Sequence, residues 1–142
     1  DILSTEQASF IRWQRILNWV LCTLALISSI CRPDWNIVFG LIGLTILVKF
    51  FDKDTKYFAG LLFVMYAVSV VMDIIWMLIV LPAWGDDQST SQSWKSLSGV
   101  HNLAAFCAFM EVLVKSFILF MLFRFGAVSD FKYINDGAVV YK

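Results

Sequence analysis

The chain has 142 residues, of which 60% are hydrophobic and 16% aromatic, and its mean hydropathy is +0.76. A soluble domain of this length carries a larger share of polar residues, so the composition indicates an integral membrane protein. The formal net charge is zero, which gives no reason to expect nucleic acid as a partner.

Four apolar runs follow one another along the chain, at residues 11–30, 36–51, 57–81 and 100–123. A helix needs about 20 mostly apolar residues to cross a hydrocarbon core of about 30 Å, and these runs lack the alternation of a membrane barrel. We therefore expect an all-α integral membrane protein, a bundle of four transmembrane helices. Because the second run is the shortest, three crossings with an interfacial second segment are the alternative.

The segment before the first run has its own pattern. Ser4, followed by Gln7 three residues later, fits a capping box, which predicts a short interfacial helix that leads into the membrane. We expect three parts, which are an interfacial N-terminal segment at 1–15, a four-helix transmembrane domain at 16–125 and a short C-terminal tail at 126–142.

Basic residues are distributed unevenly over the two sides of the predicted bundle. If the helices alternate in direction, the side with both termini carries eight of them, namely Arg12, Arg15, Lys49, Lys53, Lys56, Arg124, Lys132 and Lys142. The other side carries two, Arg32 and Lys95. Because loops on the cytoplasmic or matrix-like side carry the excess of Lys and Arg, we expect both termini on that side.

Residues that support common membrane chemistries are few. His101 is the only histidine, which excludes a bis-histidine haem within the chain, and we expect it to cap the fourth helix or to lie at the interface. Cys22, Cys31 and Cys107 form no C-x-x-C pair, so we interpret them as small buried side chains rather than redox groups. Glycine-rich phosphate loops and hydrolase motifs are also absent from the sequence. We therefore expect no enzymatic activity, no cofactor and no bound metal.

Three ionisable residues interrupt the apolar runs, Asp73 in the third run and Glu111 and Lys115 in the fourth. Such residues are costly in a membrane and usually face other protein or a water-filled cavity. Glu111 and Lys115 share one helix face and can pair, and the long side chain of Lys115 covers much of the depth offset to Asp73. We predict an intramembrane polar cluster that locks helix packing or docks a partner, with a proton or ion relay as the alternative. The remaining interior polar residues are interpreted as ordinary packing residues, namely Thr45, Tyr66, Ser69 and Ser116.

Small residues predict close contacts between helices. Gly40 and Gly43 lie on one side of the second helix, and Ala104 and Ala108 lie on one side of the fourth. Such pairs allow helix backbones to approach each other. The thirteen Phe and six Trp residues are consistent with a lipid-facing surface or with docking into a larger membrane assembly.

Several short motifs follow in order between about residues 13 and 126. They are Trp35-Asn36 at the start of the second helix, a charged turn at 52–56, Ala59-Gly60-Leu61-Leu62, Asp73-Ile74-Ile75 with Pro82, and Leu113-Val114-Lys115. Their order and spacing resemble those of the angiotensin II receptor-associated protein family, small multi-pass regulators of receptor trafficking. The resemblance implies a scaffold without catalytic residues, to which Asp73 and Lys115 belong. The third loop is longer, and the receptor-binding tail much shorter, than in that family.

From these features we predict a non-enzymatic accessory or regulatory subunit. Its expected partners are a larger membrane protein or complex and lipids, and its expected role is in assembly, stability or trafficking. The alternative function is proton or ion conduction through Asp73, Glu111 and Lys115.

Overall fold

The computed structural model describes residues 2–30, 34–49, 55–86 and 98–140, with side-chain environments for residues 9–30, 34–49, 57–83 and 99–124. The described residues form four helices and no strand. The helices are α1 (Ile2–Ser28), α2 (Asn36–Lys49), α3 (Thr55–Asp86) and α5 (Ser98–Val140). The predicted all-α class is confirmed.

The first and last helices are longer than their apolar runs. α1 is continuous because no Gly or Pro interrupts it. Ser4 lies inside this helix, so the predicted capping box is wrong, and no break separates residues 2–15 from the first apolar run. At the other end, α5 continues through residues 126–140, so the segment predicted as a tail extends the last helix.

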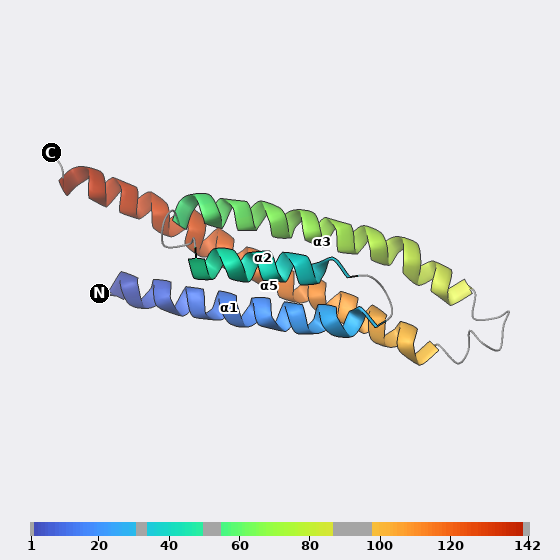
Figure 1. The fold of residues 1–142 in the computed structure, drawn as a ribbon. Helices are drawn as coiled ribbons and strands as arrows, with labels where there is room; N and C mark the ends of the chain where they lie inside the picture. Colours follow the sequence, from blue (N-terminus) through green and yellow to red (C-terminus); the bar gives the residue numbers. More distant parts are fainter. Residues whose placement is uncertain (1, 31–33, 50–54, 87–97, 141–142) are drawn as a thin grey trace.

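Neighbouring helices along the chain run in opposite directions, and both chain termini lie at the same end of the bundle (Figure 1). α1 packs against α2 and α5, and α3 packs against α5. The contact between α2 and α3 is much the least extensive of the four helix pairs that pack together. The bundle is therefore loosest between α2 and α3.

The interior of the bundle contains both an apolar core and polar side chains. The buried apolar core comprises Phe10, Leu21, Ile46, Leu47, Ala59, Leu62, Tyr66, Ile118 and Leu122. The buried polar or charged residues are Gln14, Asn18, Ser28, Asn36, Ser69, Asp73, Glu111 and Lys115. Burial of polar groups is costly unless they are hydrogen-bonded, so these residues should bond to one another.

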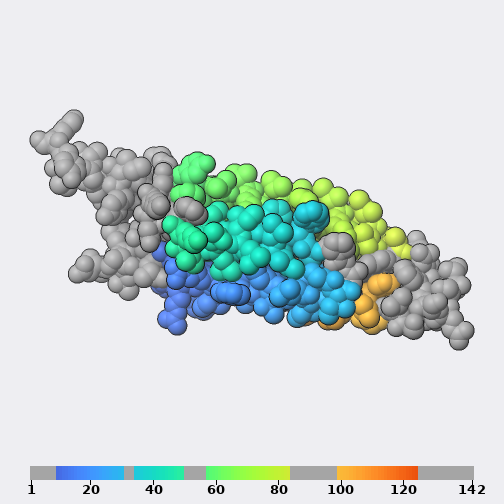
Figure 2. All heavy atoms as spheres, in the orientation of Figure 1, coloured from blue at the N-terminus to red at the C-terminus, as the bar shows by residue number. Residues whose placement is uncertain are grey.

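The outer surface of the bundle is apolar. All four helices expose large hydrophobic side chains, among them Trp19 at 62%, Leu78 at 72% and Phe123 at 62% exposure. Figure 2 shows one long face of this surface, formed by α1, α2 and α3. Polar residues inside and apolar residues outside reverse the arrangement of a soluble protein. Two of the described helices, through Tyr57–Ala83 and Gly99–Arg124, are long and apolar enough to cross a membrane.

Two glycines bring α2 close to its neighbours, as the sequence predicts. Gly40 and Gly43 are both buried. A Cβ atom at Gly40 would lie 2.5 Å from Cys22 Sγ, and one at Gly43 would lie 2.5 Å from Asn18 Oδ1 and closer still to the Tyr66 hydroxyl. Neither position has room for a side chain at the observed helix spacing. Ala104 and Ala108 in α5 are likewise fully buried.

We expect Gly43→Ala to lower the free energy of unfolding by about 1–3 kcal/mol, because the new methyl group would displace Tyr66 and Asn18. Gly60→Ala is the matched control. No atom lies within 4 Å of a Cβ at Gly60, and alanine is the better helix former, so this change should be neutral or stabilising. Denaturant titration of the two purified variants in detergent, followed by circular dichroism, measures both effects. Equal stability of the two variants would contradict the close approach of α2.

Candidate functional site

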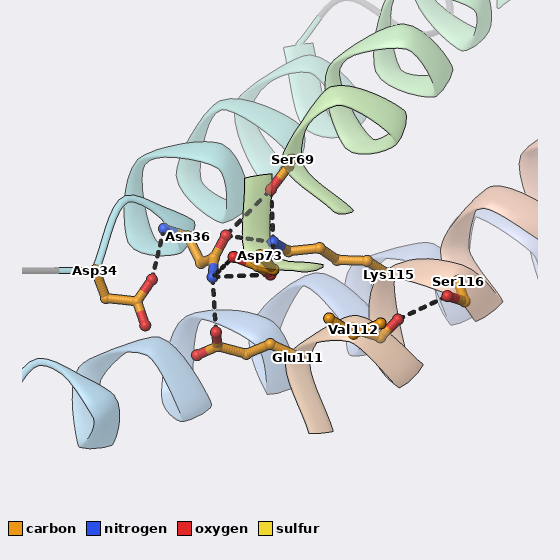
Figure 3. Close-up of polar contacts among 8 residues, drawn as sticks. All are labelled: Asp34, Asn36, Ser69, Asp73, Glu111, Val112, Lys115 and Ser116. Carbon is orange, nitrogen blue, oxygen red and sulfur yellow. Dashed lines mark hydrogen bonds and ion pairs between the residues drawn. The ribbon is translucent and has the colours of Figure 1, made fainter. Parts of the chain in front are cut away.

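Lys115 lies at the centre of the buried polar residues. Its side chain is 0% exposed, and its Nζ forms an ion pair of 2.5 Å with Asp73 Oδ2. The same Nζ donates hydrogen bonds to Ser69 Oγ, at 2.5 Å, and to Asn36 Oδ1. An ammonium group has three N–H donors, and these three oxygen atoms match them (Figure 3). Lys115 therefore ties α5 to α2 and α3.

Asn36 connects two acidic residues, Asp73 and Glu111. Its Nδ2 donates to Glu111 Oε2 at 2.7 Å and to Asp73 Oδ1 at 3.3 Å. Its Oδ1 accepts hydrogen bonds from Lys115 and, at 3.1 Å, from the Ser69 hydroxyl. We call Asn36, Ser69, Asp73, Glu111 and Lys115 the polar cluster. The amide of Asn36 suits this position because it carries a donor group and an acceptor group at once.

The start of α2 places Asn36 in the cluster. Asp34 Oδ1 accepts a hydrogen bond of 3.0 Å from the backbone N–H of Asn36, and the carbonyl of Trp35 accepts from the N–H of Val38 at 3.0 Å. These contacts satisfy backbone groups that the start of a helix leaves without intrahelical partners. α2 therefore begins beside the polar cluster, whereas α3 and α5 extend well past this point (Figure 1).

The acidic groups at the site outnumber the basic ones. The Asp34 carboxyl is close enough to Glu111 to interact with it, and Asp73 pairs with Lys115. Three carboxyl groups thus accompany one ammonium group among the described residues here. The formal charge of the site is negative.

A cavity of about 240 Å³ lies between α2 and α3, on the loosest side of the bundle. Its polar lining comes from Asp34, Asn36, Ser69 and Asp73, so the cavity reaches the polar cluster. Its apolar lining comes from Trp35, Phe39, Met72 and Trp76. The cluster is therefore closed toward α5 and accessible from the α2–α3 side.

A second set of polar contacts lies between the cluster and the end that holds the termini. The Tyr66 hydroxyl donates to Asn18 Oδ1 and lies 3.4 Å from the carbonyl oxygen of Phe39. Asn18 Nδ2 donates to the backbone carbonyl of Gln14 at 2.8 Å, and Gln14 Nε2 donates to the carbonyl of Ile118 at 3.4 Å. Polar side chains therefore occur at successive levels of the bundle interior.

The structure brings Asp73, Glu111 and Lys115 together, as the sequence predicts. Lys115 pairs with Asp73 on α3. This contact requires the third and fourth apolar runs to be neighbours, as the sequence analysis assumed. Glu111, four residues before Lys115 on the same helix, joins the cluster through the amide of Asn36. The cluster is therefore built mainly between helices rather than along α5.

Sequence reasoning missed part of the site and misread several residues. Tyr66 and Ser69 were expected to be ordinary packing residues, but both are buried and hydrogen-bonded to polar side chains. Thr45 and Ser116 were also expected in the interior, but both are exposed, and each donates to a carbonyl of its own helix. Asn36 was the main omission, and the signal for it was an amide directly at the start of an apolar run.

The remaining candidate residues do not join the cluster. Cys22 and Cys107 are buried and form no disulfide, which agrees with their interpretation as small side chains, and Cys31 lies outside the described residues. His101 is partly buried in the first turn of α5. Within the described ranges, no group of three or more His, Cys, Asp or Glu residues is arranged to hold a metal ion.

We expect Lys115→Met to destabilise the protein by about 3–5 kcal/mol, because it leaves the Asp73 carboxyl buried without its counter-charge. The double variant Asp73→Asn, Lys115→Met removes both charges and should be more stable than Lys115→Met alone. Ser116→Ala is the matched control on α5, and it should change stability by no more than about 0.5 kcal/mol since this hydroxyl bonds within its own helix. Asp73→Asn alone completes the cycle, and unfolding in detergent measures all four variants. Strictly additive single effects would contradict the ion pair.

Comparisons with known proteins identify no relative of this chain. No family model, no curated protein and no solved structure matches it. The function is therefore inferred from the geometry of the bundle and of the polar cluster.

Proposed function

We propose that the chain is a non-enzymatic, multi-pass membrane subunit that binds a larger membrane protein or complex and contributes to its assembly, stability or trafficking. The observation that carries this proposal is the saturation of Lys115, whose ammonium group has an acceptor for each of its donors inside the bundle. A charge held in this way stabilises helix packing. The apolar outer surface is then the part of the molecule available for lipids and for a partner.

We propose four membrane crossings. α3 and α5 are long enough, and α1 has 27 residues. α2 has 14 residues, so at about 1.5 Å per residue it is shorter than a hydrocarbon core of about 30 Å. A locally thinner bilayer, or residues that flank the helix, would complete this crossing. The alternation of the helices in Figure 1 supports the proposal, since successive crossings of a membrane run in opposite directions.

We place both termini on the cytoplasmic or matrix-like side. Arg12, Arg15, Lys49 and Arg124 are exposed, and they belong to the helix segments nearest the end that holds the termini. Loops and helix ends on the cytoplasmic or matrix-like side are enriched in Lys and Arg. The distribution of these residues supports the orientation that the whole sequence predicts.

Single-cysteine labelling tests this topology, after replacement of the native cysteines. We expect a cysteine at Ser129 and one at Asp52 to react with an impermeant reagent from one side of the membrane, and a cysteine at Ser91 from the other. Reaction of Ser91 and Ser129 positions from the same side would contradict four crossings. A cysteine at Ser4 should react from the same side as the Asp52 position, and reaction of these two positions from opposite sides would place α2 along the interface instead.

The partner is expected at a groove between α1 and α5. This groove has a volume of about 260 Å³ and is lined by Trp13, Phe117, Phe120, Met121 and Arg124. Trp and Arg are enriched among the residues that contribute most to binding in protein interfaces, and aromatic residues generally are over-represented there. The groove thus combines the side chains of an interface with the apolar surroundings of a membrane helix.

Photo-crosslinking in native membranes tests the docking site. A photoreactive amino acid at Phe120 should capture one defined protein, whereas the same amino acid at Leu78, an exposed position on α3 outside the groove, should yield mainly lipid adducts. Mass spectrometry of the products distinguishes the two. Lipid adducts alone at both positions would contradict docking at this groove.

A second function, proton or ion conduction, is favoured by the polar side chains that continue from the cluster through Tyr66 and Asn18 to Gln14. Gln14 Oε1 is buried and has no hydrogen-bond partner among the described residues, a position where water would be favoured. The two functions differ in one outcome. If Asp73→Asn leaves the assembled protein intact but abolishes proton or ion flux in reconstituted vesicles, conduction replaces the accessory role.

We also propose kinship with the angiotensin II receptor-associated protein family. Three of the short motifs contribute polar side chains to one site, since Asn36, Asp73 and Lys115 contact one another in the polar cluster. If this chain and the family share one scaffold, the motifs that they have in common should lie together in the folded protein. This convergence supports the resemblance.

A further inference from the structure

The cavity between α2 and α3 combines two kinds of lining that occur together at few sites. Asp34 and Asp73 place carboxyl groups at it, and Trp35, Phe39 and Trp76 place aromatic rings at it. Asp73 keeps about a tenth of its side chain exposed although it is paired with Lys115 on its buried side. Carboxylates attract cations through charge, and aromatic faces attract them through the ring quadrupole.

The charge balance at the cavity favours a positively charged ligand. Asp34 and Asp73 both line the cavity, whereas the single ammonium of Lys115 pairs with Asp73 on the buried side. In surroundings of low dielectric, uncompensated negative charge is costly, and a bound cation offsets it. The cavity lies where this excess is accessible, because both aspartates line it.

The lining selects an organic cation over a metal ion. Ca²⁺ and Mg²⁺ prefer to be surrounded by six or more oxygen ligands, whereas half of this lining consists of Trp, Phe and Met side chains. Pockets for drug-sized ligands have volumes of about 300–1,000 Å³. At about 240 Å³, this cavity suits a single small head group.

We propose that the α2–α3 cavity binds an alkylammonium group, with the carboxyl groups of Asp34 and Asp73 as counter-ions and the rings of Trp35 and Trp76 against its methyl or methylene groups. The group is supplied either by a choline or ethanolamine lipid head group or by a soluble amine. Trimethylammonium recognition by aromatic residues follows the same physics. This site is separate from the partner groove between α1 and α5, so it does not depend on the accessory role.

Titration of the full chain in a non-ionic detergent tests the chemistry of the site. Choline chloride should raise the unfolding temperature and change the tryptophan fluorescence with saturation. Two matched probes should do neither, namely 3,3-dimethylbutan-1-ol, the neutral isostere of choline, and potassium chloride at equal ionic strength. If the neutral alcohol changes the unfolding temperature and fluorescence as much as choline does, the cavity binds apolar groups without regard to charge. If potassium does so, the effect of choline is non-specific cation binding. Either result, or no response to choline, overturns the proposal.

Variants assign the binding to this cavity. Asp34→Asn removes a charge but keeps an oxygen that accepts the N–H of Asn36, and Trp76→Leu removes a ring. Each should weaken choline binding about tenfold. Trp19→Leu is the matched control, because Trp19 lines a different surface depression on α1 that has no charged residue. Unchanged affinity in a folded Asp34 or Trp76 variant, or equal loss in the Trp19 variant, would place the binding elsewhere.

Nanodiscs distinguish the two sources of the ligand. If a lipid head group occupies the cavity, the choline response should disappear in phosphatidylcholine nanodiscs and persist in phosphatidylglycerol nanodiscs. If a soluble amine is the ligand, the response should persist in both. Loss of the response in phosphatidylglycerol as well as in phosphatidylcholine would contradict a site formed by the protein itself.

Discussion

The ammonium group of Lys115 is buried in a bundle whose outer surface is apolar, and its stabilisation constrains most of the structure around it. Removal of an ion from water costs several kcal/mol even after relaxation. Three oxygen atoms, from Asn36, Ser69 and Asp73, compensate for this cost. They come from two helices other than the lysine's own, so α2, α3 and α5 must keep their relative positions for the charge to remain solvated by the protein.

This requirement explains where α2 begins. Its first residue, Asn36, must lie at the depth of Asp73 and Glu111, and Asp34 satisfies the backbone N–H that is left there. α2 and α3 otherwise touch little, so the polar cluster supplies much of what joins them. The same looseness leaves the cavity beside Asp73. The buried charge of Lys115 and the cavity beside Asp73 thus both follow from the way in which α2 and α3 meet at the polar cluster.

The sequence predicts the existence of the helices well because each continuous apolar run is longer than a strand and lacks the alternation of one. It also identifies Asp73, Glu111 and Lys115, since charges stand out against an apolar background. It does not reveal Asn36 as the hub, because an amide at a helix start is usually explained by local capping. Ser69 and Tyr66 were misread for a related reason. A hydroxyl that bonds to its own helix and one that bonds across the bundle have the same sequence pattern, and only tertiary packing separates Ser116 from Ser69.

The central claim, that Lys115 is held by Asp73 inside the bundle, is tested most directly by solid-state nuclear magnetic resonance of the protein in lipid bilayers. With Lys labelled in ¹⁵Nζ and Asp in ¹³Cγ, we expect a strong dipolar contact between Lys115 and Asp73, consistent with a nitrogen–oxygen separation of 2.5 Å. Lys115→Arg should remove the labelled signal and thereby assign it. A Lys115 Nζ that shows contacts to water or lipid protons but none to Asp73 would contradict the claim.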